Sequence, residues 1–298
     1  MSLLDDVRQV RRGWRWGEVK PRSWPERAPA VPDRSSNLGW ARAEPVRSVR
    51  WLLQKGVSLP FTRIMANPQV RGAEWMESLE QPAIIAANHA SHADLQLLLY
   101  ALPDRARERT VVAAAADYWY QRPWLGRLVS LWLNTFPFSR TGGPQAVLHH
   151  SSQLLKSGWH LLIFPEGSRS PDGRLQEFKP GVGFLARETG APVVPIHVRG
   201  GQRIMPKGRA YPLPGPAQVT IGRPLQAQGK ESARAFAGRV ERSVRELASG
   251  TSQPEVIGSW IERWRAAEPR SGATARRRAR SSAAELVRAL CLAERAVR

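Results

Sequence analysis

A short polar segment near the end of the first third of the chain contains the residues best suited to acid–base chemistry. It reads Asn-His-Ala-Ser-His-Ala-Asp over residues 88–94. An apolar run precedes it and a helical pattern follows it, so His89 would lie in a turn and Asp94 in the first turn of a helix. A carboxylate in that place can fold back toward the imidazole, fix its tautomer and stabilise its protonated form. The other ring nitrogen could then take a proton from a hydroxyl group at neutral pH, which is general-base catalysis.

The same segment allows two other interpretations. Ser91 and Asp94 have the spacing of a helix capping box with Ser91 as the N-cap, and a cap can coexist with a catalytic dyad. His89, His92 and Asp94 could also be three metal ligands. The metallo-β-lactamase motif, however, has one residue between its two histidines and another histidine directly after the aspartate, whereas here two residues separate the histidines and Leu95 follows Asp94. We therefore expect no metal.

A second polar segment supplies a guanidinium and a carboxylate. It reads Phe-Pro-Glu-Gly-Ser-Arg-Ser over residues 164–170 and also follows an apolar run. The planar fork of Arg169 suits a phosphate group, and Gly167 permits close backbone approach. Glu166 could orient Arg169 or accept from a substrate hydroxyl; a surface salt bridge between the two is the structural alternative. Another arginine, Arg140, ends the segment Asn-Thr-Phe-Pro-Phe-Ser-Arg over residues 134–140.

The chain offers no evident nucleophile of its own. No Gly-x-Ser-x-Gly sequence occurs in it, which argues against a serine hydrolase. Its single cysteine, Cys291, excludes a disulfide scaffold and any zinc or iron–sulfur site built from several cysteines. The predicted base would therefore activate a substrate hydroxyl or water directly.

Strand and helix patterns alternate along the chain and would place both polar segments at one edge of a sheet. Short apolar runs predict strands over residues 82–87, 110–115, 159–164, 192–198 and 218–221. Apolar or amphipathic patterns predict helices over residues 94–102, 123–133, 181–189 and 232–248. This alternation is typical of an α/β fold, in which ligands gather beyond the carboxyl ends of the strands.

Taken together, these segments resemble the glycerolipid acyltransferase family with the His-x4-Asp motif, which includes the 1-acylglycerol-3-phosphate O-acyltransferases. The family's first block, Asn-His-x-Ser-x-x-Asp, is complete over residues 88–94. Its third block, Phe-Pro-Glu-Gly-Thr-Arg-Ser, is matched over residues 164–170 with Ser168 in place of threonine. The second block, which ends in arginine, is matched over residues 136–140, and the fourth, a strand with a central proline, over residues 193–196.

The resemblance implies a mixed, mostly parallel sheet flanked by helices, as in glycerol-3-phosphate acyltransferase. It also implies transfer of a fatty acyl group from a thioester, acyl-CoA or acyl carrier protein, to a hydroxyl of lysophosphatidic acid or a related glycerophospholipid. His89 would take the proton of that hydroxyl and Asp94 would orient His89, without an acyl-enzyme and without a cofactor beyond the thioester co-substrate. The family positions associated with the acceptor's glycerol phosphate are Arg140, Glu166, Gly167 and Arg169.

The net charge of +20 indicates an anionic partner such as a membrane surface, an acidic carrier or a phosphorylated substrate. We expect a basic, flexible arm over residues 1–45, an acyltransferase domain over 46–230 and a helical, Arg-rich extension over 231–298. Residues 46–66 form a roughly helical apolar stripe with basic residues among them, which predicts either a membrane-facing or an ordinary packing helix. Because the chain shows no secretory signal pattern and no apolar run near ~18 residues, we expect peripheral attachment to the cytoplasmic side of the cell membrane.

Three other classes of function share parts of this pattern. A nucleic-acid-binding protein would explain the charge, but no helix-turn-helix, RNA-recognition or zinc-finger signature occurs, so nucleic acid is not expected as a partner. A lipid-binding protein could keep the fold without turnover, although the intact His89 and Asp94 argue against it. An acyl hydrolase would use the same dyad with water as the acceptor.

Overall fold

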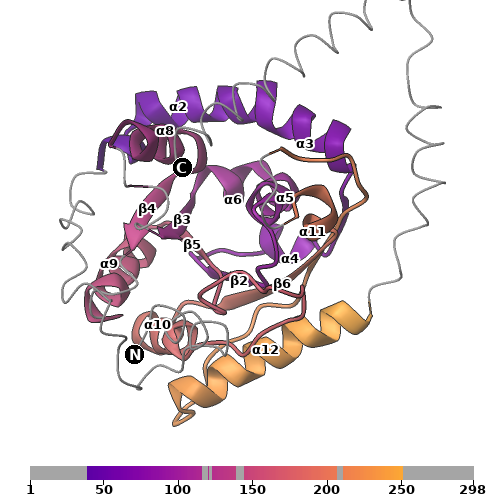
Figure 1. The fold of residues 1–298 in the computed structure, drawn as a ribbon. Coiled ribbons are helices and arrows are strands. Elements are labelled where there is room, and N and C mark those ends of the chain that lie inside the picture. Colours follow the sequence, from indigo (N-terminus) through magenta and orange to yellow (C-terminus); the bar gives the residue numbers. More distant parts are fainter. Residues whose placement is uncertain (1–38, 116–119, 121–122, 139–143, 207–210, 251–298) are drawn as a thin grey trace, which may run out of the picture.

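A computed structural model describes residues 39–115, 120, 123–138, 144–206 and 211–250 of the chain. Within these ranges the centre is a seven-stranded sheet in the order β1–β7–β6–β2–β5–β3–β4 (Figure 1). Neighbouring strands are parallel except β6 and β7, which are antiparallel. The strands are β1 (Gln69–Arg71), β2 (Ile84–Ala87), β3 (Thr110–Ala115), β4 (Thr135–Phe138), β5 (His160–Ile163), β6 (Val193–Arg199) and β7 (Gln218–Ile221). The predicted mixed, mostly parallel α/β sheet is confirmed.

Helices cover both faces of the sheet because its central strands are apolar on both sides. In β2, Ile84 faces one hydrophobic core and its neighbour Ile85 faces the other. A strand with this continuous apolar pattern needs cover on each face. The first face is covered by α9 (Pro144–Lys156), α10 (Gly181–Thr189) and α12 (Ala233–Ser249) (Figure 1). The other face is covered mainly by α5 (Ala93–Ala101) and α6 (Asp104–Glu108), with α4 (Glu74–Glu77) and α11 (Gly201–Ile204) nearby.

The predicted helical segment over residues 46–66 forms a helix that runs on through Pro60. It consists of α2 (Glu44–Leu53), the π-helical turn η3 (Gln54–Ser58) and α3 (Leu59–Ala66), preceded by the 3-10 turn η2 (Gly39–Arg42). In η3 the Leu59 N–H bonds to the Gln54 carbonyl, five residues back. This wider turn relieves the clash of a proline ring with the carbonyl four residues earlier, so the chain stays helical.

This helix, α2–η3–α3, carries polar side chains on its buried side. The buried polar residues recur at every fourth position: Arg50, Gln54, Ser58 and Thr62. Gln54 Nε2 donates to the Trp132 carbonyl of α8 (Pro123–Leu133) at 2.8 Å, and Ser58 Oγ donates to Gln96 Oε1 of α5 at 2.7 Å. The large exposed apolar side chains of the same helix, here called its outer face, are Val49, Trp51, Leu52 and Ile64. The hydrophobic pattern is thus inverted relative to a helix that packs its apolar side on a core.

The expected elements agree closely with the observed ones where the pattern was strongly apolar. β3, β7, α8 and α10 have the predicted bounds, whereas β1, β4 and α9 were not predicted as elements. β1 pairs only three residues at the sheet edge, and β4 contains Pro137, so neither shows a clear strand pattern.

Helix α12 falls within the predicted C-terminal extension, yet its apolar side is part of the core. Phe236, Val240 and Val244 are fully buried against β6 and α10. The predicted arm before residue 39 and the predicted extension after residue 250 lie outside the described residues. No helix in the described ranges has the length and apolarity needed to span a membrane.

Candidate active site at the carboxyl ends of strands β2 and β5

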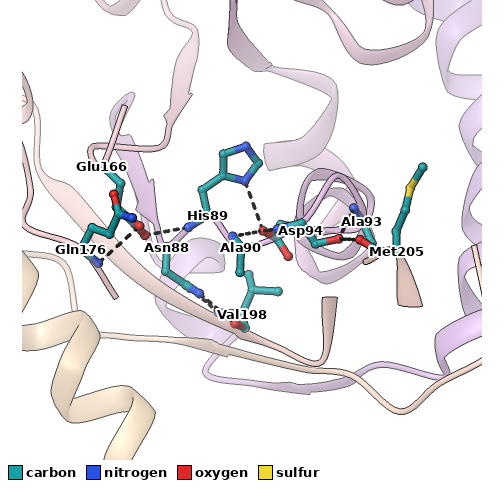
Figure 2. Close-up of polar contacts among 10 residues, drawn as sticks. Asn88, His89, Ala90, Ala93, Asp94, Glu166, Gln176, Val198 and Met205 are labelled. Atoms are coloured by element: carbon teal, nitrogen blue, oxygen red, sulfur yellow. Dashed lines mark hydrogen bonds and ion pairs between the residues drawn. The ribbon is translucent and has the colours of Figure 1, made fainter. Parts of the chain in front are cut away.

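His89 and Asp94 form the predicted pair just beyond β2. The strand ends at Ala87 and α5 begins at Ala93, so the connection is short. His89 Nδ1 lies 3.2 Å from Asp94 Oδ2, and the Asp94 side chain is 1% exposed against 19% for His89. The second ring nitrogen of His89 points away from the carboxylate (Figure 2). That nitrogen can take a proton while the buried carboxylate stabilises the imidazolium.

The Asp94 carboxylate also fixes the backbone of its own loop. Oδ2 accepts the Ala90 N–H at 2.6 Å and the Ser91 N–H at 2.7 Å, in addition to facing His89 (Figure 2). Two backbone N–H groups and the imidazole nitrogen therefore converge on one oxygen, which holds the carboxylate in one orientation. The dyad and the capping arrangement coexist, as the sequence allowed.

The cap itself differs from the prediction by one residue. Helix α5 has His92 at the N-cap position rather than Ser91. The Ser91 hydroxyl still accepts the Ala93 N–H at 3.1 Å, but it donates to the Met205 carbonyl at 2.8 Å and so connects the loop to the chain after β6. Ser91 therefore lies one residue before the N-cap, where its hydroxyl reaches both Ala93 and Met205.

Glu166 is buried and joins the two predicted polar segments. Its Oε1 accepts the His89 N–H at 2.8 Å and its Oε2 accepts the Gln176 N–H at 3.3 Å (Figure 2). Burial raises the pKa of the Glu166 carboxyl to about 7, and the two backbone hydrogen bonds offset only part of that shift. Of the alternatives that the sequence left open for Glu166, a pairing with Arg169 is not formed: among the described contacts, the Glu166 carboxylate meets backbone amides and no guanidinium.

Arg169 brings positive charge close to the dyad. It is half-buried, and no carboxylate within the described ranges forms an ion pair with it. Burial lowers the pKa of His92 to about 4, with smaller contributions from the charges of Arg169 and His89, so both of these side chains lie within electrostatic range of His92. Gly167 has a φ of +77°, a backbone conformation that favours glycine. The end of the Lys179 side chain lies over it, because a Cβ there would be 2.4 Å from Lys179 Nζ.

Two residues within the quoted motifs position His89 in ways that their spacing did not predict. Phe164 stacks on the imidazole with 4.0 Å between ring centroids and 17° between planes. The Asn88 amide donates to the Val198 carbonyl at 3.0 Å and accepts the Val198 N–H at 2.7 Å (Figure 2). Asn88 thus continues the pairing of β2 with β6 through its side chain. The only signal for this role was a side chain with both a donor and an acceptor at the end of a buried strand.

Two further predictions concern Arg140 and metal binding. Arg140 lies outside the described residues, so its predicted contact with the acceptor stays a prediction. In the part of the chain that the structure describes, no group of three or more His, Cys, Asp or Glu side chains is arranged to hold a metal ion.

The sequence matches a known family over the part that forms this site. Residues 67–199 match the family model Acyltransferase. This match confirms the resemblance inferred from the motif blocks.

Individual relatives point in the same direction. The chain is 32% identical over 169 residues to the chloroplastic 1-acyl-sn-glycerol-3-phosphate acyltransferase LPAT1 of Arabidopsis thaliana, covering 56% of this chain and 44% of that protein. It is 30% identical over 186 residues to 1-acyl-sn-glycerol-3-phosphate acyltransferase alpha of Homo sapiens, covering 59% and 62%. The chain spans about half the length of the curated relatives it matches.

A solved structure shows the same fold. The crystal structure of the 1-acyl-sn-glycerophosphate (LPA) acyltransferase PlsC from Thermotoga maritima superposes with a TM-score of 0.55 at 24% sequence identity. The match covers 76% of this chain and 86% of that chain. At this identity the likeness concerns the fold.

Proposed function

We propose that the chain is an O-acyltransferase that moves a fatty acyl group from acyl-CoA or acyl carrier protein to a hydroxyl of lysophosphatidic acid or a related glycerophospholipid. The observation that carries the proposal is the buried Asp94 carboxylate held against His89 within an acyltransferase domain. The shared name of the relatives, 1-acyl-sn-glycerol-3-phosphate acyltransferase, supports this class of acceptor.

In the proposed reaction, His89 Nε2 takes the proton of the acceptor hydroxyl while that oxygen attacks the carbonyl carbon of the thioester. Asp94 accepts from Nδ1–H and stabilises the imidazolium that forms. The carbon–sulfur bond then breaks, the ester remains, and His89 passes its proton to the departing thiolate. All bonds form directly between donor and acceptor, so no acyl-enzyme is needed.

The proposal assigns the acceptor's phosphate to Arg169, because its guanidinium lies near the dyad without a carboxylate partner in the described ranges. Glu166 acts through His89 instead of contacting the phosphate, since both of its oxygens accept backbone N–H groups and a second anion would repel it. Gly167 allows Lys179 to lie over the same loop.

The test is an assay of thioester consumption and lipid products by mass, with and without lysophosphatidic acid. Purified wild type is compared with His89→Ala and with a control, His149→Ala, whose side chain is exposed on α9. We expect acceptor-dependent formation of phosphatidic acid by wild type and control, and its loss in His89→Ala.

The other outcomes separate the alternatives. Thioester loss that does not need the acceptor would indicate a hydrolase. Lipid binding without turnover, across a panel of lysolipids with both CoA and acyl carrier protein donors, would indicate a binding protein. An acyl product from another lysolipid would keep the reaction and change the acceptor.

We also propose that the protein attaches to the surface of an anionic membrane through helix α2–η3–α3. Its polar residues Gln54 and Ser58 face the protein, whereas its outer face is apolar. On the neighbouring helix α8, Trp124 and Leu128 are exposed as well, at positions four residues apart that share one side. A cluster of exposed aromatic and aliphatic side chains of this kind fits the interfacial layer of a bilayer.

Point substitutions test this attachment better than deletion, because removing the helix would also remove the bonds of Gln54 and Ser58 to α8 and α5. The triple variant Val49→Ser, Leu52→Ser, Ile64→Ser should float poorly with vesicles. Phe184→Ser, which changes an exposed apolar side chain on α10, is the control and should float like wild type. Equal flotation of all three proteins would contradict the proposal.

A further inference from the structure

The side chain of Lys179 extends over the second polar segment, residues 164–170. A Cβ built on Gly167 would lie 2.4 Å from Lys179 Nζ and 2.8 Å from its Cε, so the ammonium group lies against the backbone of this loop. Lys179 is exposed, so an anion can reach it from solvent. The same loop carries Arg169, to which the proposed function assigns the acceptor's phosphate. The loop thus carries one cation and lies against another.

The backbone around Lys179 is fixed from two sides. The Lys179 N–H donates to the Pro165 carbonyl at 2.9 Å, which ties it to the start of the loop. The N–H of the preceding residue, Phe178, donates to Glu241 Oε2 of α12 at 3.0 Å, and the Phe178 side chain is buried in the core. Because the base of the lysine side chain is held in this way, less of it remains to be ordered when an anion binds.

The loop beneath Lys179 runs alongside the backbone of the proposed catalytic histidine. Glu166 accepts the His89 N–H at 2.8 Å, and the Ser170 N–H donates to the His89 carbonyl at 2.8 Å. Residues 167–169, which lie between these two bonds, are therefore held close to the group that takes the acceptor's proton.

This closeness indicates which substrate phosphate the ammonium would meet. In lysophosphatidic acid, the reacting hydroxyl and the phosphate are on neighbouring carbons of glycerol. In acyl-CoA, the long pantetheine arm separates the thioester from the first phosphate. A cation over a loop that contacts His89 therefore matches the phosphate of the acceptor and not those of the donor.

Two cations of different shape suit a phosphate monoester better than a diester. A monoester carries a charge of about −1.5 to −2 at pH 7 and has three free oxygens, whereas a diester carries one charge on two free oxygens. The planar fork of Arg169 can bind two oxygens, and the compact ammonium of a lysine can bind a third. We propose that Lys179 binds the third oxygen of the acceptor's phosphate, so that the enzyme selects a phosphate monoester over a diester. This inference rests on the proposed function and deepens it by naming a residue that selects the headgroup.

The test measures acyl transfer to lysophosphatidic acid and to lysophosphatidylglycerol, which have the same acyl chain and are presented in the same neutral detergent micelles. Lys179→Met removes the charge and keeps most of the stem, Lys179→Gln is a second charge-free variant in case the first does not fold, and Lys179→Arg keeps the charge. The matched control is Lys156→Met. Lys156 is exposed at the end of α9, from which the chain enters β5 at the edge of the sheet opposite the dyad. Thermal unfolding verifies the fold of each variant.

We expect Lys179→Met to raise the KM for lysophosphatidic acid by about ten- to hundredfold at nearly unchanged kcat, which is the scale of one hydrogen bond to a charged group. The kcat/KM for lysophosphatidylglycerol should change little, so the preference for the monoester is lost. Lys179→Arg should recover most of the preference, and Lys156→Met should behave like wild type.

Three results would overturn the inference. One is a wild type without preference for lysophosphatidic acid, and another is a preference that survives in Lys179→Met, even if kcat falls, because Lys179 would then only support the loop. The third is a rise in the KM for the thioester donor instead of the acceptor. In each case, acyl transfer by wild type and its loss in His89→Ala would leave the proposed function intact. Wild type that acylates no lysophospholipid would overturn the proposed function and this inference with it.

Discussion

The carboxylate of Asp94 rests directly against Gly201: a Cβ on that glycine would lie 2.1 Å from Asp94 Oδ1. Gly201 begins α11, just after β6. Asp94 thus packs against the backbone that follows β6, on the side of its carboxylate opposite His89 Nδ1. The contact of Ser91 Oγ with the Met205 carbonyl belongs to the same support. The loop that carries His89 and Asp94 is therefore supported by the segment that follows β6.

Substitution of Gly201 by alanine should therefore impair catalysis without unfolding the protein. The new methyl group would push the Asp94 carboxylate away from His89 Nδ1, and we expect kcat to fall by about one to two orders of magnitude, the scale of a slightly misplaced catalytic group. Gly238→Ala in α12 is the control, because the nearest atom to its Cβ is 3.9 Å away. Steady-state kinetics with both variants would contradict the argument if their kcat values were equal.

Asp94→Asn should separate the two tasks of this carboxylate. An asparagine oxygen can still accept the Ala90 and Ser91 N–H groups, so the loop should keep its shape. It cannot stabilise the imidazolium by charge, and we expect kcat to fall by about 10²–10⁴-fold with little change in melting temperature. Asp94→Ala should lower both. If Asp94→Asn lost stability but kept kcat, Asp94 would be a helix cap and no more.

The sequence was sufficient to predict the dyad because its cause is local. His89 and Asp94 are five residues apart across a strand–helix junction, so short-range geometry brings them together. The same holds for β2, β3 and α10, whose apolar patterns fix their places. The orientation of the outer face of α2 was not readable in this way. The apolar side of that helix fits either a core or a membrane, and only the contacts of Gln54 and Ser58 with α8 and α5 show that the polar side is the buried one.

The site contacts that the sequence did not predict join segments that lie far apart along the chain. Glu166 and His89 are 77 positions apart, and Asn88 and Val198 are 110 apart. Spacing along the chain carries no information about such pairs, so the sequence left open whether Glu166 pairs with Arg169 or contacts a substrate hydroxyl. In the structure Glu166 is buried, and its carboxylate is satisfied by backbone N–H groups instead.

Glu166 should influence turnover more than acceptor affinity. Glu166→Ala removes the acceptor of the His89 N–H, so the catalytic loop loses its anchor to the second segment. We expect kcat to fall by about tenfold or more while the KM for lysophosphatidic acid changes little. Glu166→Gln keeps one oxygen for His89 and should recover part of the loss. A rise in the acceptor KM at unchanged kcat would instead indicate that Glu166 touches the substrate, as the family resemblance implied.

The raised pKa of Glu166 predicts a component of stability that declines as pH rises. Its folded pKa is about 7 against an ordinary value of 4.5, so between these values the folded state binds more protons than the unfolded state. The contribution is fully present below pH 4.5 and is lost through pH 7, amounting to at most about 3 kcal/mol. His92, His160 and His197 act in the opposite direction, because burial lowers each pKa to about 4.

The dependence of the free energy of unfolding on pH is therefore a sum over several groups. The difference in this free energy between wild type and Glu166→Gln isolates the contribution of Glu166. Urea unfolding from pH 5 to 8 should show that wild type loses stability relative to Glu166→Gln as the carboxyl ionises. Glu77→Gln, an exposed carboxylate on α4, is the control and should run parallel to wild type. If the wild-type and Glu166→Gln curves were parallel across this range, Glu166 would already be ionised at pH 5, and its burial would not govern its charge.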